Sequence, residues 1–124
     1  MTVSLAARLN VATSTSLNGP WVTHDNIPIE GYGSPVSKQN NVNPSPLVLP
    51  NGTVILVYCD DADGEHICLA KADDAVKGPY TKLGPPSVPL FDHHCEDPYI
   101  YKGRAGYHIV CHDMCAQPGL PLLP

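Results

Sequence analysis

Apolar and polar residues alternate in short runs through the middle of the chain, and Pro, Gly, Asn or Asp bounds each run. Alternation of this kind between turn-forming residues is typical of β-strands. We therefore expect a sheet built from short strands joined by tight turns. The pattern predicts strands at residues 43–49, 54–59 and 66–72, an outer strand opening at residues 77–80, and a further strand within residues 92–101.

Two polar segments between these runs are predicted turns. Asn51-Gly52 lies between two apolar runs, which is a strong hairpin signal. Residues 51–53 also match a glycosylation sequon, but we interpret them as the turn. Residues 61–65 are rich in carboxylates but lack the full loop of a calcium site, so they are interpreted as a hairpin turn, and residues 60–64 are the predicted polar turn.

The chain repeats itself at a period typical of larger β architectures. A Gly-Pro-aromatic triplet at residues 19–21 recurs at residues 78–80, after 59 positions. A strand–turn–strand pattern that opens at Pro46 recurs at Pro98, after 52 positions. A unit of short strands that recurs at this interval is typical of a β-propeller blade.

Composition removes several classes of protein. The 14 prolines and 10 glycines argue against a helical bundle, because each interior proline costs a helix about 3 kcal/mol. The net charge of −5 and the absence of any basic run argue against a nucleic acid or an anionic membrane as partner. No secretory signal and no apolar run of about 20 residues is visible, so the sequence assigns no compartment.

Five cysteines, an odd number, do not predict a disulfide framework, and most of them lie in apolar runs where Cys acts as a small hydrophobe. One alternative is a metal-binding domain, because side chains of metal-ligand types cluster late in the chain. The spacing lacks paired Cys-x-x-Cys or a His-Glu-x-x-His helix, so we predict no metal and no cofactor. The cluster comprises His93, His94, Cys95, Glu96, His108, Cys111, His112 and Cys115.

The order of these motifs resembles the five-bladed β-propeller glycoside hydrolases, most closely family 43, over roughly residues 9–114. An Asn-Pro-Ser-Pro run at residues 43–46 leads to a Val-Tyr strand end. A Glu-Asp-Pro-Tyr-Ile-Tyr-Lys run at residues 96–102 is followed by Gly-Tyr at 106–107. In that family, similar runs open two successive blades, and Gly-Pro-aromatic triplets recur at the outer edges of blades.

The resemblance implies an all-β chain that forms part of a five-bladed propeller, about two blades of four-stranded antiparallel sheet. It implies one partial domain, residues 1–124, in four segments. Residues 1–35 would end one blade, 40–90 would form a full blade, 91–114 would start the next, and 115–124 would be an irregular tail. The open blade edges would favour self-association.

The family's chemistry uses three acids: a general base, a carboxylate that adjusts pKa, and a general acid. Inverting hydrolysis requires the acid and base to lie about 6.5–9.5 Å apart, on either side of the sugar. By resemblance, Glu96 is the general acid and Asp97 the second candidate, although strand alternation places Asp97 on the opposite face. Asn43, His94 and Tyr99 are candidate sugar contacts. Aromatic residues are otherwise predicted to pack between blades, namely Trp21, Tyr80, Tyr99 and Tyr101.

Two departures from the family weaken the expected catalysis. Asn43 stands where the family has its modulating Asp, and an amide supplies no charge to raise a neighbouring pKa. The general-base Asp of the first blade would lie upstream of Met1. We therefore expect a glycosidase-like protein, of a family acting on arabinose- or xylose-type polysaccharides, that is impaired alone. The alternative is a non-catalytic carbohydrate-binding or scaffold remnant.

Overall fold

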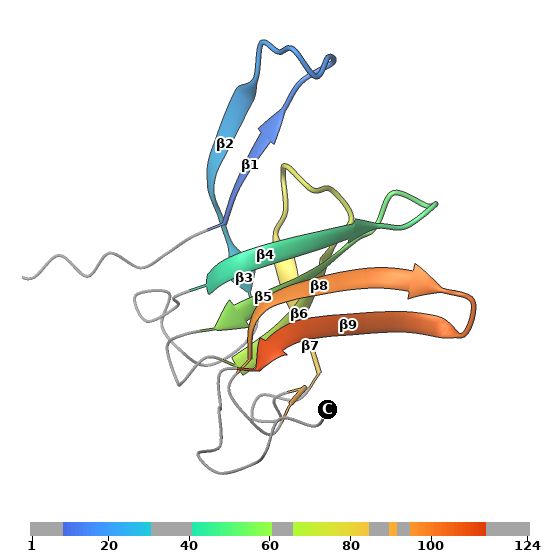
Figure 1. Cartoon of the computed structure of the whole chain (residues 1–124). Helices are drawn as coiled ribbons and strands as arrows, with labels where there is room; N and C mark the ends of the chain where they lie inside the picture. Colours follow the sequence, from blue (N-terminus) through green and yellow to red (C-terminus); the bar gives the residue numbers. More distant parts are fainter. Residues whose placement is uncertain (1–8, 31–40, 61–65, 85–89, 92–94, 114–124) are drawn as a thin grey trace, which may run out of the picture.

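The computed structural model describes residues 9–30, 41–60, 66–84, 90–91 and 95–113 of the chain (Figure 1). Every regular element in these ranges is a β-strand, so the predicted all-β class is confirmed. No helix in the same ranges is long and apolar enough to cross a membrane. The strands are β1 (Leu9–Thr13), β2 (Val22–Ile27), β3 (Ile29–Glu30), β4 (Asn41–Val48), β5 (Val54–Asp60), β6 (His66–Ala72), β7 (Tyr80–Leu83), β8 (Cys95–Gly103) and β9 (Gly106–Asp113).

A five-stranded sheet forms the centre of the molecule, in the spatial order β3-β7-β6-β5-β4. Strands β4 to β7 follow one another as an antiparallel meander. At its first turn Gly52 has a φ of 88°, which glycine adopts without steric cost, and its N–H donates to the carbonyl of Leu49 at 2.9 Å. The turn predicted at Asn51-Gly52 is therefore confirmed. Strand β3 pairs in parallel with β7.

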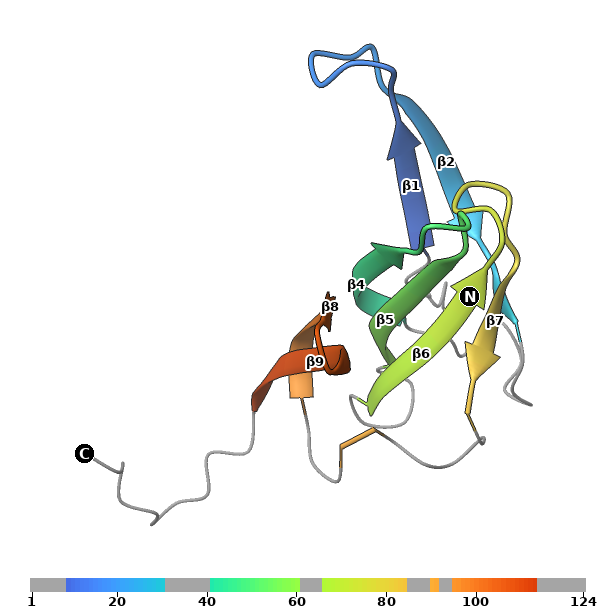
Figure 2. The same ribbon diagram turned by 90° about the vertical axis from the view of Figure 1, so that its right-hand side faces the viewer.

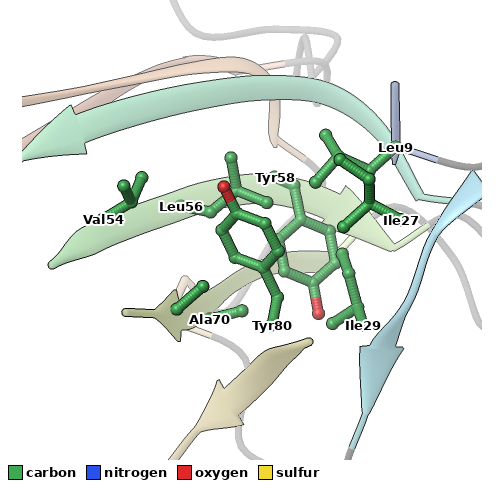
Figure 3. Close-up of a cluster of buried hydrophobic side chains, with 9 residues drawn as sticks. Leu9, Ile27, Ile29, Val54, Leu56, Tyr58, Ala70 and Tyr80 are labelled. Atoms are coloured by element: carbon green, nitrogen blue, oxygen red, sulfur yellow. The ribbon is translucent and has the colours of Figure 1, made fainter. Parts of the chain in front are cut away.

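Both faces of the central sheet are buried, each against a different hairpin. On one face Leu56, Tyr58 and Tyr80 pack against Leu9 and Ile27 of the β1–β2 hairpin (Figure 3). On the other face the buried cluster joins the sheet to the β8–β9 hairpin and consists of Val57, Cys59, Ile67, Cys95 and Ile100. Figure 2 shows the two hairpins flanking the central sheet. Adjacent positions of β5 serve opposite clusters because strand side chains alternate.

The strand registers contain an internal repeat. The residue pairs of β1–β2 recur in β6–β7 once one extra residue before the second Gly-Pro pair is allowed for, with Thr13 opposite Val22 in one hairpin and Lys71 opposite Thr81 in the other. In the same way β8–β9 matches β4–β5, because a bulge interrupts each pairing after its second residue pair. The bulges align Pro44 with Pro98. The prediction that Pro46 corresponds to Pro98 is therefore wrong by two positions.

The predicted strands lie close to the observed ones. The strand at residues 66–72 is confirmed, while the strand predicted at 54–59 continues to Asp60 and the one predicted at 43–49 begins and ends earlier. The outer strand was expected to open at residue 77 but begins at Tyr80. Asp74 accounts for this difference, because its Oδ1 accepts the N–H groups of Val76 at 2.8 Å and Lys77 at 2.9 Å and holds them in a turn.

Candidate functional site

The starts of β4 and β8 share a local backbone feature that carries three of the predicted site residues. In each strand one extra residue is accommodated, between Val42 and Ser45 in β4 and between Glu96 and Tyr99 in β8. Asn43 has a φ of 53° and Asp97 a φ of 50°, and each precedes a proline. Asn and Asp tolerate this left-handed conformation better than other residues with a side chain, so the sequence suits the bulge at both places.

The two bulges lie at the same end of the molecule. Strands β4 and β8 run side by side in the same direction (Figure 1). A hydrogen bond links them where the bulges end, because the backbone N–H of Ile100 donates to Ser45 Oγ at 3.4 Å. Asn43 therefore shares one end of the strand pair with Glu96 and Asp97. The two strand starts thus bring candidate residues of both recurring units to one end of the strand pair.

The two predicted acids at the bulge of β8 differ in their exposure to solvent. Glu96 is half-buried and lies opposite His112 in the β8–β9 ladder, whereas Asp97 is exposed. The buried positions along β8 are Cys95, Pro98 and Ile100, so the two-residue period is broken at Asp97. The regular alternation assumed for Glu96 and Asp97 is interrupted at this point of β8 by the extra residue of the bulge.

Of the two remaining predicted sugar contacts, His94 lies outside the described residues and Tyr99 lies on β8. Tyr99 has 59% of its surface exposed and stands on the face of β8 opposite the buried Ile100. Its ring stacks on Tyr101, with centroids 6.2 Å apart, and Tyr101 stacks on His108 at 5.0 Å.

The prediction that aromatic residues pack between repeats holds for one residue of the four. Tyr80 is buried, and its hydroxyl donates to the carbonyl of Ala75 at 3.2 Å. Burial also raises the pKa of Tyr80. Trp21 is 54% exposed, Tyr101 is 40% exposed and Tyr99 is 59% exposed, so these three side chains are not buried between repeats.

Three thiols meet between the central sheet and β8–β9. Cys59 Sγ donates to the carbonyl of Cys95 at 3.3 Å. Burial, together with the hydrogen bond to the Cys95 side chain, raises the pKa of Cys111 to about 12. The four cysteines of the described ranges carry thiols rather than disulfides. In those ranges no group of three His, Cys, Asp or Glu side chains is arranged to hold a metal ion, and His93 and Cys115 lie outside them.

An ion pair that the sequence did not predict lies at the end of the central sheet where β4 begins. Asp60 is opposite Asn41 at the start of β4, and its Oδ2 is 2.9 Å from Nζ of Lys82. Both side chains are largely buried, and the ammonium lies 5.9 Å from the centroid of the Tyr58 ring. The nearby Cys68 thiol has a raised pKa because of burial, which the charge of Lys82 partly offsets. Asp60 was assigned to a polar turn, and only the extension of β5 by one residue brings it into the sheet.

Comparison with known proteins adds no relative. No protein-family model matches the chain, and no curated protein matches its sequence.

Proposed function

We propose that the chain forms part of a five-bladed β-propeller related to glycoside hydrolases, with β4–β7 as one blade and the flanking hairpins as halves of two others. The matching residue pairs of β1–β2 and β6–β7 support this proposal, as do the matching bulges of β4 and β8. Packing of successive units face to face, through two buried clusters on opposite faces of one sheet, also suits a propeller.

We propose further that carbohydrate binds where β4 and β8 begin, with Glu96 as proton donor to the leaving oxygen in the parent reaction. The observation that carries this proposal is the meeting of the two bulged strand starts at one end, joined by the Ser45–Ile100 hydrogen bond. A half-buried carboxyl beside an exposed one, Glu96 beside Asp97, offers two environments at neighbouring positions.

The second candidate function is carbohydrate binding without hydrolysis, and one observation favours it. Asn43 is exposed at the start of β4, where an amide can bond a sugar hydroxyl but contributes no charge. A general acid without its paired base loses acid–base cooperation, for which each partner contributes typically about 10²–10⁴-fold. Under this second function the chain binds oligosaccharide and does not hydrolyse it at a measurable rate.

The test measures release of the aryl group from arabinosyl and xylosyl aryl glycosides, together with oligosaccharide binding by calorimetry. The glycosidase proposal predicts slow turnover that Glu96→Gln abolishes while binding is kept, because the amide preserves shape but donates no proton. Asp25→Asn is the matched control, since Asp25 is an exposed carboxylate on β2, and it should change neither quantity.

Three outcomes separate the candidates. Turnover that is lost in Glu96→Gln but kept in Asp25→Asn supports the glycosidase function. Oligosaccharide binding with no turnover in the wild-type chain supports the binding function. No binding and no turnover with arabino- and xylo-oligosaccharides would contradict both.

A further inference from the structure

The two hairpins that flank the central sheet correspond to its two halves. By register β1–β2 matches β6–β7, and β8–β9 matches β4–β5. In the central sheet these halves are joined along β5 and β6, over seven residue pairs. Within the described ranges, the corresponding edges of β9 and β1 pair with no strand. The molecule therefore presents two complementary halves of one four-stranded sheet.

The composition of these two edges differs from that of the other sheet edges. Proteins protect exposed strand edges with proline, lysine or other charges, or by keeping the edge strand short. Strand β4 contains Pro44 and Pro46, β8 contains Pro98 and Lys102, and β3 has only two residues. Strand β1 contains no proline and no charged residue, and β9 contains a single charge, at its last position. Strand β2 carries Asp25 within it. Among the edges of the described strands, the two complementary ones therefore have the least of this protection.

The two edges cannot pair within one chain. The β1–β2 hairpin packs on one face of the central sheet and the β8–β9 hairpin on the other. The two hairpins therefore lie on opposite sides of the sheet (Figure 2). Among the described strands, the one that fits the β9 edge is β1, and it can reach that edge only from another copy of the chain.

We propose that a second copy of this chain supplies it, and that β1 of one copy pairs antiparallel with β9 of the next, in the register of β6 on β5. Val57 lies opposite Leu69 in the central sheet, and the matching positions are Val110 in β9 and Val11 in β1. Val110 is 52% exposed in the single chain and would be covered by this pairing. The proposal depends on strand register alone, so it holds or fails independently of any action on carbohydrate.

Such an interface is head to tail, because the two copies use different edges. A heterologous contact repeats until it closes into a ring, or it grows as a filament. The expected particles therefore have masses that are integer multiples of 13.3 kDa, and each junction completes a four-stranded sheet.

The first experiment places a lysine on the proposed edge of the full chain. Val110→Lys should shift the mass measured by light scattering after gel filtration from a multiple of 13.3 kDa to the single-chain value, because edge lysines oppose strand addition. Val48→Lys is the matched control, since Val48 is 66% exposed on β4 and lies outside the proposed junction. A wild-type mass of 13.3 kDa at all concentrations tested, or equal loss of association in both variants, would overturn the proposal.

The second experiment tests the register by disulfide trapping under mild oxidation. The double variant Val11→Cys/Val110→Cys should form covalent oligomers that reducing agent removes. Val11→Cys/His108→Cys is out of register by two residues and should form far fewer covalent oligomers. Both double variants contain the same native cysteines, so these do not account for the difference. Trapping of Val110→Cys alone to the same extent would indicate symmetric β9–β9 pairing and would refute the head-to-tail arrangement.

Discussion

Ile100 tests whether the β8–β9 hairpin is an integral part of the fold. Its side chain is 4% exposed and lies in the cluster that joins the hairpin to β5 and β6. Replacing it by alanine removes three carbons, which at about 0.8 kcal/mol each gives roughly 2.4 kcal/mol of lost transfer free energy. The cavity left behind raises the expected loss in the free energy of unfolding to about 3–4 kcal/mol.

The neighbouring residue supplies a matched control. Tyr99 lies on the same strand but is 59% exposed, and its ring contacts that of Tyr101 rather than the core. Tyr99→Ala should therefore cost only about 0.5–1 kcal/mol, although it deletes the larger side chain.

Urea unfolding followed by circular dichroism measures both variants. With a slope of about 2 kcal/mol per molar urea, Ile100→Ala should lower the midpoint by roughly 1.5–2 M and Tyr99→Ala by less than about 0.5 M. Near-ultraviolet dichroism reports the hairpin itself, because three of the tyrosines lie on β8 and β9. Equal shifts for the two variants, or a larger shift for Tyr99→Ala, would refute the packing of β8–β9 on the central sheet.

Two further predictions concern charged and titrating groups. Lys82→Met should destabilise the fold by about 2–4 kcal/mol, because Asp60 would lose the ammonium partner of a largely buried ion pair, and Lys82→Met/Asp60→Leu should recover most of that loss in urea unfolding. The folded-state pKa of Cys111 is raised to about 12 from an ordinary 9.0, so the unfolded chain releases this proton first as pH rises. The stabilisation from Cys111 should therefore be present in full below pH 9 and be lost as pH rises towards 12. Plotted against pH over this interval, the free energy of unfolding should fall less steeply in Cys111→Val than in the wild type. Equal slopes in the two proteins would contradict the assignment.

Much of the central sheet could be predicted from local pattern. Residues 66–72 form the predicted strand, and Asn51-Gly52 forms the predicted turn, because apolar alternation and turn chemistry act over a few neighbouring residues. The start of β7 could not be predicted, because the carboxylate of Asp74 accepts hydrogen bonds from the N–H groups of Val76 and Lys77 and keeps these residues out of the strand.

The candidate site was less predictable than the strands. Glu96, Asp97 and Asn43 stand out as residue types in the sequence, but the bulges that present them depend on pairing with strands later in the chain. The Asp60–Lys82 pair was missed because 22 residues separate its partners, and only the meander brings them together. Tyr99 was a candidate contact by residue type, and its exposed face was decided by the packing of Ile100.

Residue type and spacing along the chain are enough to predict the all-β class, the recurring strand–turn unit and the Asn51-Gly52 turn. Tertiary structure decided the alignment of the repeats, in which Pro44 rather than Pro46 corresponds to Pro98. It also decided which hairpin covers which face of the central sheet and, among the described strands, which edges have no paired neighbour. The physical reason is that register and burial are set by contacts between residues far apart in the chain, and no local pattern contains that information.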